Sequence, residues 1–562
     1  MYIMGINSAY HESAVCLLYN GQVIAAVEEE RFNRQKRGKL SAINNADTLP
    51  VLAIEYCLNR AGIRLSDVNW IGYSIDPYKR VQNSGFVDKV VPNSWGSPEG
   101  EEIFYKSIQN VPTKLREMGF IGTFKWFEHH LCHAASAFYP SPFDEAAVMV
   151  VDGIGEIDTA SIFEGRNIVL ERVKQIDYPA SIGFLWEKIS QFIGFTEYDS
   201  CKVMGLAAYG DPDIYRSQFR DIVQLLEDGI FTVDNNIMQF RSETYDGLQQ
   251  LFGISRRQVG EPLNQSHMNI AASLQDITEE TIVHLAKAAS RLTNSRNLCL
   301  AGGVALNCIA NRAIEKTGLF DHIYVQPAAN DAGTALGAAY LAWYELSEDA
   351  KRCPLKTTYL GPEYDNQEIL EALQQTNLKY RLCDDIALEA AQLLSQGRLV
   401  GWFQGAMEFG PRALGNRSLL ANPSDYETRN KINHAVKHRE HFRPFAPSVL
   451  EEEAAAWFDC DDPPMAAEYM LIGYKAHEDK RDKIPAVVHK DGTCRIQIVK
   501  QSSNPAYHKL ISLFHQLTGV PILLNTSLND SEPIVCSPTD ALQTFMKTQI
   551  DYLAIGDYLV YK

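Results

Sequence analysis

Two histidines and two aspartates have the residue types of a metal-binding site. His129 and His133 stand four residues apart, so on a helix both imidazoles lie on one face, one turn apart. Asp152 and Asp331 each follow a predicted strand, where α/β domains place their ligands. Two imidazoles and two carboxylates with open positions suit Fe(II), Zn or Mn, and the ligand types do not choose among them. Local hydrogen bonding for the histidines, and helix-cap or turn roles for the aspartates, are the alternatives.

Small residues at two places predict a nucleotide site. Gly302 and Gly303 remove side chains where a predicted strand passes into a helix that begins near Asn307, so a phosphate could approach the backbone and the helix N-terminus. Lys202 and Gly205 lie in a run that we predict to be a second small-residue turn, with the lysine placed to meet phosphate. A solvated loop lysine is the alternative interpretation.

Cations interleaved with phenylalanine and proline mark the last third of the chain. Arginine has a planar fork that suits bidentate recognition of phosphate. The aromatic and proline residues between these cations favour a rigid, partly enclosed anion pocket over a solvated charged face. The residues predicted to form this pocket are Arg412 or its neighbour Arg417, Lys437, Arg443, Arg495, Asn525 and Ser527.

An α/β framework must position these residues. The apolar runs 2–9 and 22–27, with a tight turn at Asn20-Gly21, predict a hairpin, and a second hairpin begins with 146–151. Two hairpins, each presenting a polar or glycine-rich loop, indicate a duplicated α/β unit. Strands then alternate with helices, as in an α/β domain. The regular pattern breaks at about 350–365, where we place a domain boundary.

The size and composition limit the class of protein. A chain of 562 residues favours two or more domains. The net charge of −18 argues against broad binding to nucleic acid, which depends on cationic residues. The 11 scattered cysteines include no C-x-x-C pair, which is typical of reduced thiols. With no signal-like N-terminus and no long apolar window, we predict a cytoplasmic protein without membrane insertion.

In combination, the motifs resemble the carbamoyltransferase family that includes the nodulation-factor and antibiotic O-carbamoyltransferases. The matching runs, in chain order, are GINSAYHESA, EHHLCHAASAF, VVDGIGE, CLAGGVALN, PAANDAGTALGAA, EFGPRALGNRS, REHFRPFAP and LLNTSLN. They extend from the first predicted strand to beyond Ser527, so the resemblance covers nearly the whole chain.

The resemblance implies two domains. Residues 1–355 are expected to form an actin-like ATPase domain, a duplicated ribonuclease H-like fold similar to the tRNA threonylcarbamoyl transferase, that binds metal and transfers the carbamoyl group. Residues 356–562 are expected to form a YrdC-like α/β domain that makes carbamoyladenylate from carbamoyl phosphate and ATP, with Mg²⁺ accompanying ATP. The family's metal ligands fall on the two histidines and two aspartates named above, with Fe(II) as the expected ion.

The resemblance also assigns roles to single residues. His11 matches the family's candidate catalytic histidine, which would take the proton from the acceptor hydroxyl. The predicted anion-pocket residues match the family's phosphate and carbamoyl ligands, with Arg412 preferred over Arg417. The acceptor is expected to be a small molecule, such as a sugar or another natural product of secondary metabolism. The stretches 77–119 and 209–258, which match no motif, are expected to form its pocket, and a homodimer is compatible with the sequence.

Three other functions compete. The N-terminal resemblance alone would permit threonylcarbamoyl transfer to tRNA, but the acidic balance and the absence of a basic stripe weigh against it. A non-catalytic actin-like ATPase switch would leave the histidine–aspartate set and the arginine-rich region unexplained. A metallohydrolase built on H-x-x-x-H lacks the general-base glutamate of H-E-x-x-H, because His130 follows His129.

Overall fold

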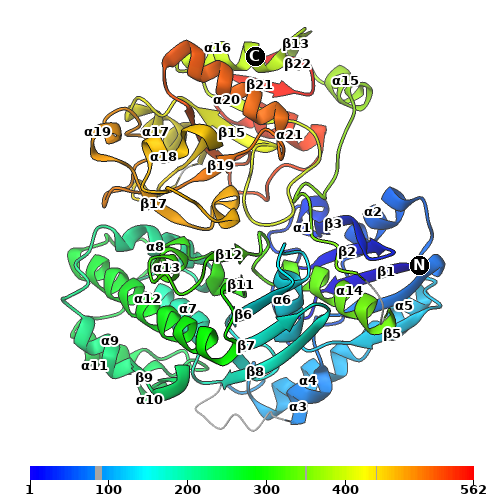
Figure 1. The fold of residues 1–562 in the computed structure, drawn as a ribbon, viewed down its shortest axis with the longest axis vertical. Helices are drawn as coiled ribbons and strands as arrows, with labels where there is room; N and C mark the ends of the chain where they lie inside the picture. Colours follow the sequence, from blue (N-terminus) through cyan, green and yellow to red (C-terminus); the bar gives the residue numbers. More distant parts are fainter. Residues whose placement is uncertain (83–90, 348–350, 438) are drawn as a thin grey trace. The chain divides into compact units, whose positions relative to one another are not determined.

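The computed structural model describes residues 1–82, 91–347, 351–437 and 439–562. The chain forms two compact units (Figure 1). Unit 1 comprises residues 1–29 and 37–355, and unit 2 comprises residues 30–36 and 356–562. No helix in the described ranges is long and apolar enough to cross a membrane.

The first sheet of unit 1 has the strand order β3-β2-β1-β4-β5. Its strands are β1 (Tyr2–Asn7), β2 (Ala14–Tyr19), β3 (Gln22–Glu28), β4 (Val68–Tyr73) and β5 (Thr123–Trp126). β1 runs antiparallel to β2 and parallel to β4. The predicted pairing of 2–9 with 22–27 is wrong, because 14–19 forms an additional strand between them. The turn at Asn20-Gly21, with φ of 49° and 80°, joins β2 to β3.

The second sheet repeats this arrangement. It contains β6 (Glu145–Val151), β7 (Asp158–Arg166), β8 (Val169–Asp177), β11 (Asn297–Ala301) and β12 (His322–Val325). Its order is β12-β11-β6-β7-β8, which is the order of the first sheet read from the other end. Three antiparallel strands followed by two parallel ones thus occur twice, which confirms the duplicated ribonuclease H-like fold of the actin-like ATPase class.

Helices pack closely on these sheets because small residues line their contacts. The helices that matter for the site are α3 (Pro77–Gln82), α4 (Pro98–Ile108), α6 (His129–Phe138), α7 (Ile182–Phe192), α8 (Ser200–Ala207), α12 (Gln265–Thr293), α13 (Cys308–Glu315) and α14 (Ala332–Leu346). A Cβ atom on Gly337 of α14 would lie 1.8 Å from the carbonyl oxygen of Cys132 on α6. A Cβ atom on Gly5 of β1 would lie 1.9 Å from the carbonyl oxygen of Ala335. Glycine at both positions therefore lets α14 touch α6 and β1 directly.

Unit 2 is a mixed α/β unit, and its described part contains an eight-stranded sheet of order β13-β22-β21-β14-β15-β20-β16-β19. The strands are β13 (Lys379–Leu382), β14 (Val400–Phe403), β15 (Arg417–Ala421), β16 (Ala446–Leu450), β19 (Gln497–Val499), β20 (Ile522–Ser527), β21 (Tyr552–Ile555) and β22 (Tyr558–Tyr561). Helices α16 (Ile386–Ser395), α20 (Pro505–Thr518) and α21 (Pro538–Lys547) pack on this sheet.

The short segment 30–36 belongs to unit 2 although it comes from the N-terminal part of the chain. Arg31 donates from Nη2 to the carbonyl oxygen of Gly410 at 2.9 Å. Arg34 donates to the carbonyl oxygens of Pro533 and Ile534 at 2.6 and 2.9 Å. Phe32 packs against a buried apolar cluster of the same unit. The chain therefore passes into unit 2 and back before unit 1 is complete.

Candidate functional site

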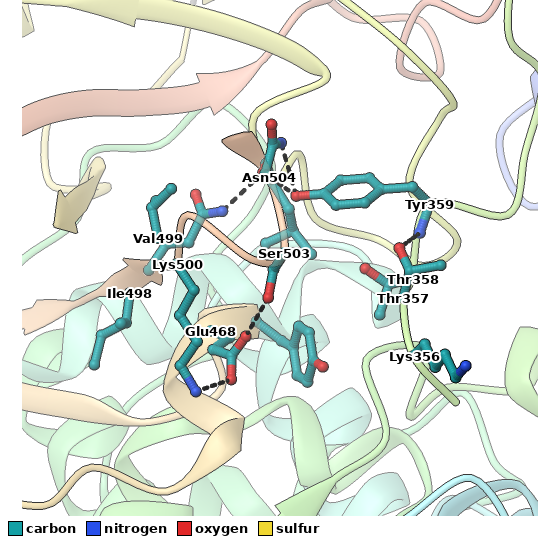
Figure 2. A pocket seen from close by; sticks show the side chains of 13 residues that line it. Lys356, Thr357, Thr358, Tyr359, Glu468, Ile498, Val499, Lys500, Ser503 and Asn504 are labelled. Atoms are coloured by element: carbon teal, nitrogen blue, oxygen red, sulfur yellow. Dashed lines mark hydrogen bonds and ion pairs between the residues drawn. The ribbon is translucent and has the colours of Figure 1, made fainter. Parts of the chain in front are cut away.

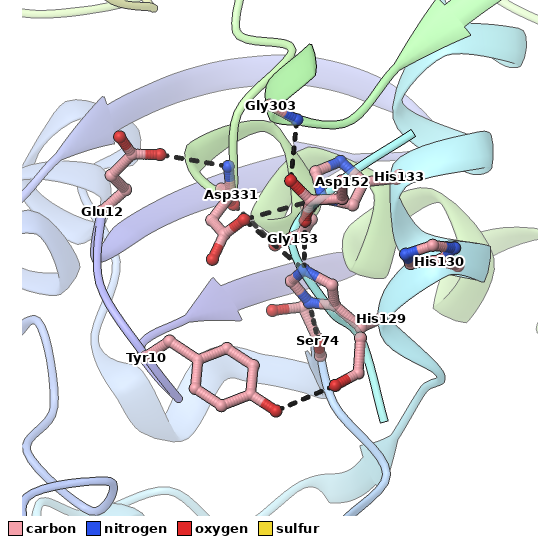
Figure 3. A network of polar contacts seen from close by, with 12 residues as sticks. Tyr10, Glu12, Ser74, His129, His130, His133, Asp152, Gly153, Gly303 and Asp331 are labelled. Carbon is pink, nitrogen blue, oxygen red and sulfur yellow. Dashed lines mark hydrogen bonds and ion pairs between the residues drawn. The ribbon is translucent and has the colours of Figure 1, made fainter. Parts of the chain in front are cut away.

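The two histidines and two aspartates of the predicted metal site lie together in unit 1 (Figure 3). His129 and His133 lie one turn apart on α6. Asp152 follows the last residue of β6, and Asp331 precedes the first residue of α14. All four side chains are buried, and each offers a ligand atom within 4.8 Å of the others. The helix spacing and the strand ends thus indicated these residues one by one, and the structure brings the set that the family resemblance joined into one cluster.

The distances within the cluster fit a bound cation. Nε2 of His129 lies 3.6 Å from Oδ2 of Asp152 and 3.5 Å from Oδ1 of Asp331. Nε2 of His133 lies 3.4 and 3.7 Å from the same two oxygens. These separations exceed normal hydrogen bonds but match the ~3.4 Å edge of a tetrahedron with bonds of about 2.1 Å. Within the described residues, both Nε2 atoms are buried and have no hydrogen-bond partner, as expected of atoms that coordinate a metal.

Neighbouring backbone groups orient these ligands. Nδ1 of His129 lies 2.9 Å from the carbonyl oxygen of Ser74, which only accepts hydrogen bonds, so the proton sits on Nδ1 and the lone pair on Nε2. Oδ1 of Asp152 accepts from the backbone N–H of Gly303 at 2.9 Å, which leaves Oδ2 for the cation. The third histidine, His130, lies outside the cluster.

His130 instead has structural partners on β7. Its Nδ1 lies 2.9 Å from Oγ of Ser161 and 3.1 Å from Oδ2 of Asp158. Burial lowers the pKa of His130 to about 4 although Asp158 opposes that shift. A neutral, hydrogen-bonded core histidine is therefore the role of the middle residue in this motif.

The charges of the cluster are mutually dependent. Burial alone would raise the pKa of Asp152, but the imidazoles of His129 and His133 hold that pKa well below its usual range. Burial alone would lower the pKa of His129, but Asp331 and Asp152 raise it well above its ordinary value. The two buried carboxylates thus require compensating positive charge, which protonated imidazoles or a bound cation can supply.

Glu156 is a supporting residue that no sequence pattern predicted. Its Oε1 accepts from the backbone N–H of Asp76 at 2.7 Å and from that of His129 at 3.0 Å. The residue before α6, Glu128, makes no side-chain cap, so Glu156 supplies the cap from the loop after β6. The buried guanidinium of Arg80 and the hydroxyl of Tyr10 bind the carbonyl oxygen of Gly155 beside it, at 3.3 and 3.0 Å.

His11 lies at the edge of the cluster. Its Nδ1 is 3.6 Å from Oδ2 of Asp331, and its side chain is 27% exposed, compared with 7% for Asp331. Oε2 of the adjacent Glu12 accepts from the backbone N–H of Asp331 at 3.2 Å. The imidazole therefore stands next to the buried carboxylates while part of its surface remains open.

The residues predicted to bind nucleotide fall into two groups. Gly302 has φ of +89°, and a Cβ atom there would lie 2.2 Å from the carbonyl oxygen of Val151, so only glycine fits. Gly303 contacts Asp152, as described above. Oδ1 of Asn307 caps α13 by accepting from the backbone N–H of Ile309 and Ala310 at 3.2 and 3.1 Å. The predicted start of a helix near Asn307 is thus confirmed.

The second predicted small-residue turn is wrong. Lys202 and Gly205 lie on helix α8, which packs on α12. Lys202 forms an ion pair with Asp199 at 3.1 Å and lies 5.5 Å from the ring centre of Phe195. Nucleotide binding by Lys202 and Gly205 stays a prediction.

In unit 2, the loop that carries Arg412 is built around a buried carboxylate. Oε1 of Glu408 accepts from the backbone N–H groups of Leu414, Asn416 and Arg417 at 2.7, 2.8 and 3.2 Å. The fully buried guanidinium of Arg417 donates to the carbonyl oxygens of residues 362, 404, 405 and 416. Because the guanidinium of Arg417 already donates to backbone carbonyl oxygens, Arg412 is the better candidate for binding phosphate.

The other predicted anion-pocket residues are only partly connected. Nζ of Lys437 donates to the carbonyl oxygens of Ser527 and Asn529 at 2.6 and 2.7 Å. Burial holds the pKa of Lys437 well below its usual range, and the charges of Arg439 and Arg443 lower that pKa further. Arg495 ends strand β18 (Thr493–Arg495) and pairs there with β17 (Gly473–Lys475).

Asn525 lies at the centre of a buried polar network. Its Nδ2 donates to Oγ of Ser448 and Oε1 of Gln497 at 3.1 and 2.9 Å. Its Oδ1 is buried and accepts no hydrogen bond from the described residues. Gln497 also lines an open pocket. Lys500 and Tyr359 border the same pocket (Figure 2). The network around Asn525 thus adjoins a pocket within unit 2.

Two family models and several known proteins resemble this chain over most of its length. A family model described as carbamoyltransferase N-terminus matches residues 2–340, and one described as carbamoyltransferase C-terminus matches residues 391–562. Nodulation protein NolNO of Sinorhizobium fredii is 38% identical, covering 99% of this chain and 80% of that protein. An uncharacterised protein of Synechocystis sp. is 37% identical, covering 100% of this chain and 97% of that protein.

Solved structures resemble this chain more remotely. T. kodakarensis HypF is 14% identical with a TM-score of 0.34, covering 62% of this chain and 48% of that protein.

The two family models together span most of both units, and their order along the chain is the order of the units. The chain therefore belongs to the carbamoyltransferase family, and it is an enzyme that transfers a carbamoyl group.

Proposed function

We propose that this enzyme is an ATP-dependent O-carbamoyltransferase. In this proposal, unit 2 uses carbamoyl phosphate and ATP to form carbamoyladenylate, and unit 1 transfers the carbamoyl group to a hydroxyl of a small molecule. The observation that carries the proposal is the buried His129–His133–Asp152–Asp331 cluster with the partly exposed His11 beside it. A switch or scaffold has no need of such a set of residues.

In unit 2, the proposed first step joins the carbamoyl group to the AMP part of ATP. Water first converts carbamoyl phosphate into carbamate and phosphate. A carbamate oxygen then attacks the α-phosphorus of ATP, which forms carbamoyladenylate and releases pyrophosphate. Arg412, Arg443 and Arg495 are assigned to the phosphates, and Mg²⁺ accompanies ATP. The buried, unpartnered Oδ1 of Asn525 is assigned to the N–H of the carbamoyl group, because that bond would satisfy an acceptor that is costly to leave unpaired.

In unit 1, the proposed second step is attack of the acceptor hydroxyl on the carbamoyl carbon, with AMP as the leaving group. His11 takes the proton from the hydroxyl as the new carbon–oxygen bond forms. Asp331 lies within reach to stabilise the imidazolium that results. A divalent cation held by His129, His133, Asp152 and Asp331, Fe(II) according to the family resemblance, would supply positive charge that opposes the negative charge developing on the transferred group.

The acceptor and the partners are part of the same proposal. A small hydroxylated molecule is favoured over tRNA because the net charge of −18 disfavours binding to phosphate backbones. Cytoplasmic location and a homodimer stay predictions. Of the stretches expected to form the acceptor pocket, 77–119 includes residues 83–90, which lie outside the described residues, and 209–258 is described throughout.

The test is pyrophosphate release by the Fe(II)-loaded protein with ATP, with and without carbamoyl phosphate, followed by mass spectrometry for carbamoyladenylate. We expect release that depends on carbamoyl phosphate, together with the adduct. Asn525→Leu, which removes the unpartnered oxygen at similar volume, should lose both. Pyrophosphate release without that dependence, or none at all, would contradict the proposal and favour another acyl donor or an actin-like ATPase.

A further inference from the structure

Helix α7 directs two side chains at the backbone next to the metal cluster. Phe184 and Glu187 are three residues apart and thus lie on one side of the helix. Gly153, the residue after Asp152, lies opposite them. A Cβ atom on Gly153 would be 3.5 Å from Cε1 of Phe184 and 3.9 Å from Oε1 of Glu187. Both side chains therefore approach the chain immediately beside a candidate metal ligand.

Phe184 belongs to a cluster of three aromatic rings. Its ring centre lies 6.0 Å from that of Tyr178 and 5.9 Å from that of Phe240, and the latter two are 6.3 Å apart. All three residues are only half-buried, whereas most aromatic residues of the core in this unit are fully covered. Rings that touch each other and remain partly open form an apolar face.

The guanidinium of Arg241 and the carboxylate of Glu187 border this apolar face but form no ion pair with each other. The guanidinium carbon of Arg241 lies 4.9 Å from the ring centre of Phe184 and 5.4 Å from that of Tyr178. Its Nε is buried and has no hydrogen-bond partner in the described ranges. Glu187 and Arg241 influence each other's pKa, yet neither forms an ion pair with any described residue.

A carboxylate and a guanidinium that form no ion pair here raise the free energy of the folded protein if their role is only structural. Burial raises the pKa of Glu187 to about 7, although the charges of His11 and Arg241 lower it. A direct ion pair or a hydrogen bond would relieve the cost, and the fold provides neither among the described residues. Groups held at such a cost beside a reactive centre are typical of binding sites.

We propose that Glu187, Arg241 and the rings of Tyr178, Phe184 and Phe240 bind the acceptor, and that they select a hydroxylated ring. The apolar face would carry the C–H face of the ring. Glu187 would accept a hydrogen bond from one ring hydroxyl, and Arg241 would donate one to another ring oxygen. This inference rests on the proposed function and names the substrate class and specificity residues of the transfer site.

The experiment compares Glu187→Ala and Phe184→Ala with the control Ser190→Ala. Ser190 lies on the same helix, and its buried hydroxyl has no partner in the described part of the chain, so its removal loses no hydrogen bond. Each Fe(II)-loaded protein is assayed with ATP and carbamoyl phosphate for pyrophosphate release, and then for carbamoylation of methyl hexopyranosides, myo-inositol and the open-chain polyol sorbitol. Iron content is measured in parallel.

We expect unchanged pyrophosphate release and iron content in all three variants. Both test variants should raise the KM for the cyclic acceptors by about tenfold or more, because a lost hydrogen bond to a charged group or a lost apolar face has that effect. Ser190→Ala should match the wild type. Wild-type protein that releases no pyrophosphate would refute the proposed function instead. Normal KM values in both test variants, or a wild type that carbamoylates sorbitol but no ring, would overturn this inference.

Discussion

Replacing Glu156 by alanine should release the metal without touching a metal ligand. The carboxylate accepts from the backbone N–H groups of His129 and Asp76, and its loss leaves the first of these buried without a partner. Loss of this cap leaves a buried donor without a partner, which costs ~1–3 kcal/mol, so unit 1 should be destabilised by about that amount. Because His129 begins α6, its imidazole should shift, and loss of such support lowers metal affinity by about 10–100-fold.

Glu156→Gln is the matched control. Its remaining carbonyl oxygen can still accept from both N–H groups. Burial, with the neighbouring charge of Asp158, raises the pKa of Glu156 to about 7, so an uncharged side chain here resembles the wild type near neutral pH. Metal affinity is measured by competition with a chelator of known affinity, and stability by denaturant unfolding of the metal-free protein. If Glu156→Ala bound Fe(II) as tightly as Glu156→Gln, the role assigned to this cap would be refuted.

Three further predictions concern other residues. Asp331→Ala should abolish carbamoyl transfer and metal binding while carbamoyl-phosphate-dependent pyrophosphate release persists; retained transfer would show that the metal assignment is wrong. Arg412→Ala should reduce pyrophosphate release at least ~10-fold with an unchanged melting temperature, whereas Arg417→Ala should lower stability by about 3 kcal/mol because it removes buried hydrogen bonds to four carbonyl groups. The pKa of Glu187 is about 7 in the folded protein and 4.5 ordinarily, so the folded state holds this proton more tightly than the unfolded state. The free energy of unfolding therefore falls as the pH rises from about 4.5 to about 7. Glu187→Gln should therefore gain stability relative to wild type above pH ~7, by at most about 3 kcal/mol, and little below pH ~4.5; equal gains at both pH values would contradict this origin.

The duplicated fold could be predicted because each repeat begins with an apolar strand and a polar or glycine-rich loop. The middle strand of the first repeat, Ala14–Tyr19, escaped prediction because the polar residues before it resembled a long loop. The run around Lys202 resembled a turn because glycine is a poor helix former, yet it is the helix α8. Packing of α8 on α12 supplies the burial that outweighs this local preference, and such packing is not written in local spacing.

His129, His133 and Asp152 could be predicted because the two histidines stand four residues apart on a helix and Asp152 directly follows a strand. Asp331 lies in the loop between β12 and α14, and the family resemblance joined it with the other three into one site. Glu156 and Glu408 could not be predicted, because their partners are backbone N–H groups, which every sequence offers at every position. Their only local signal was an acidic residue inside a recognised motif. Glu187 and Arg241 lie outside all the motifs, so only the folded chain brings Glu187 beside Gly153 and Arg241 against the rings of Phe184 and Tyr178.

The excursion of residues 30–36 determines how this protein can be divided experimentally. A fragment that starts at Lys356 lacks Arg31 and Arg34, which donate to the carbonyl oxygens of Gly410, Pro533 and Ile534. It would expose the apolar surface that Phe32 covers, and that fragment should aggregate more readily than one supplied with residues 30–36. On the ribosome, this segment emerges hundreds of residues before its partners, so the C-terminal unit completes its folding only at the end of synthesis.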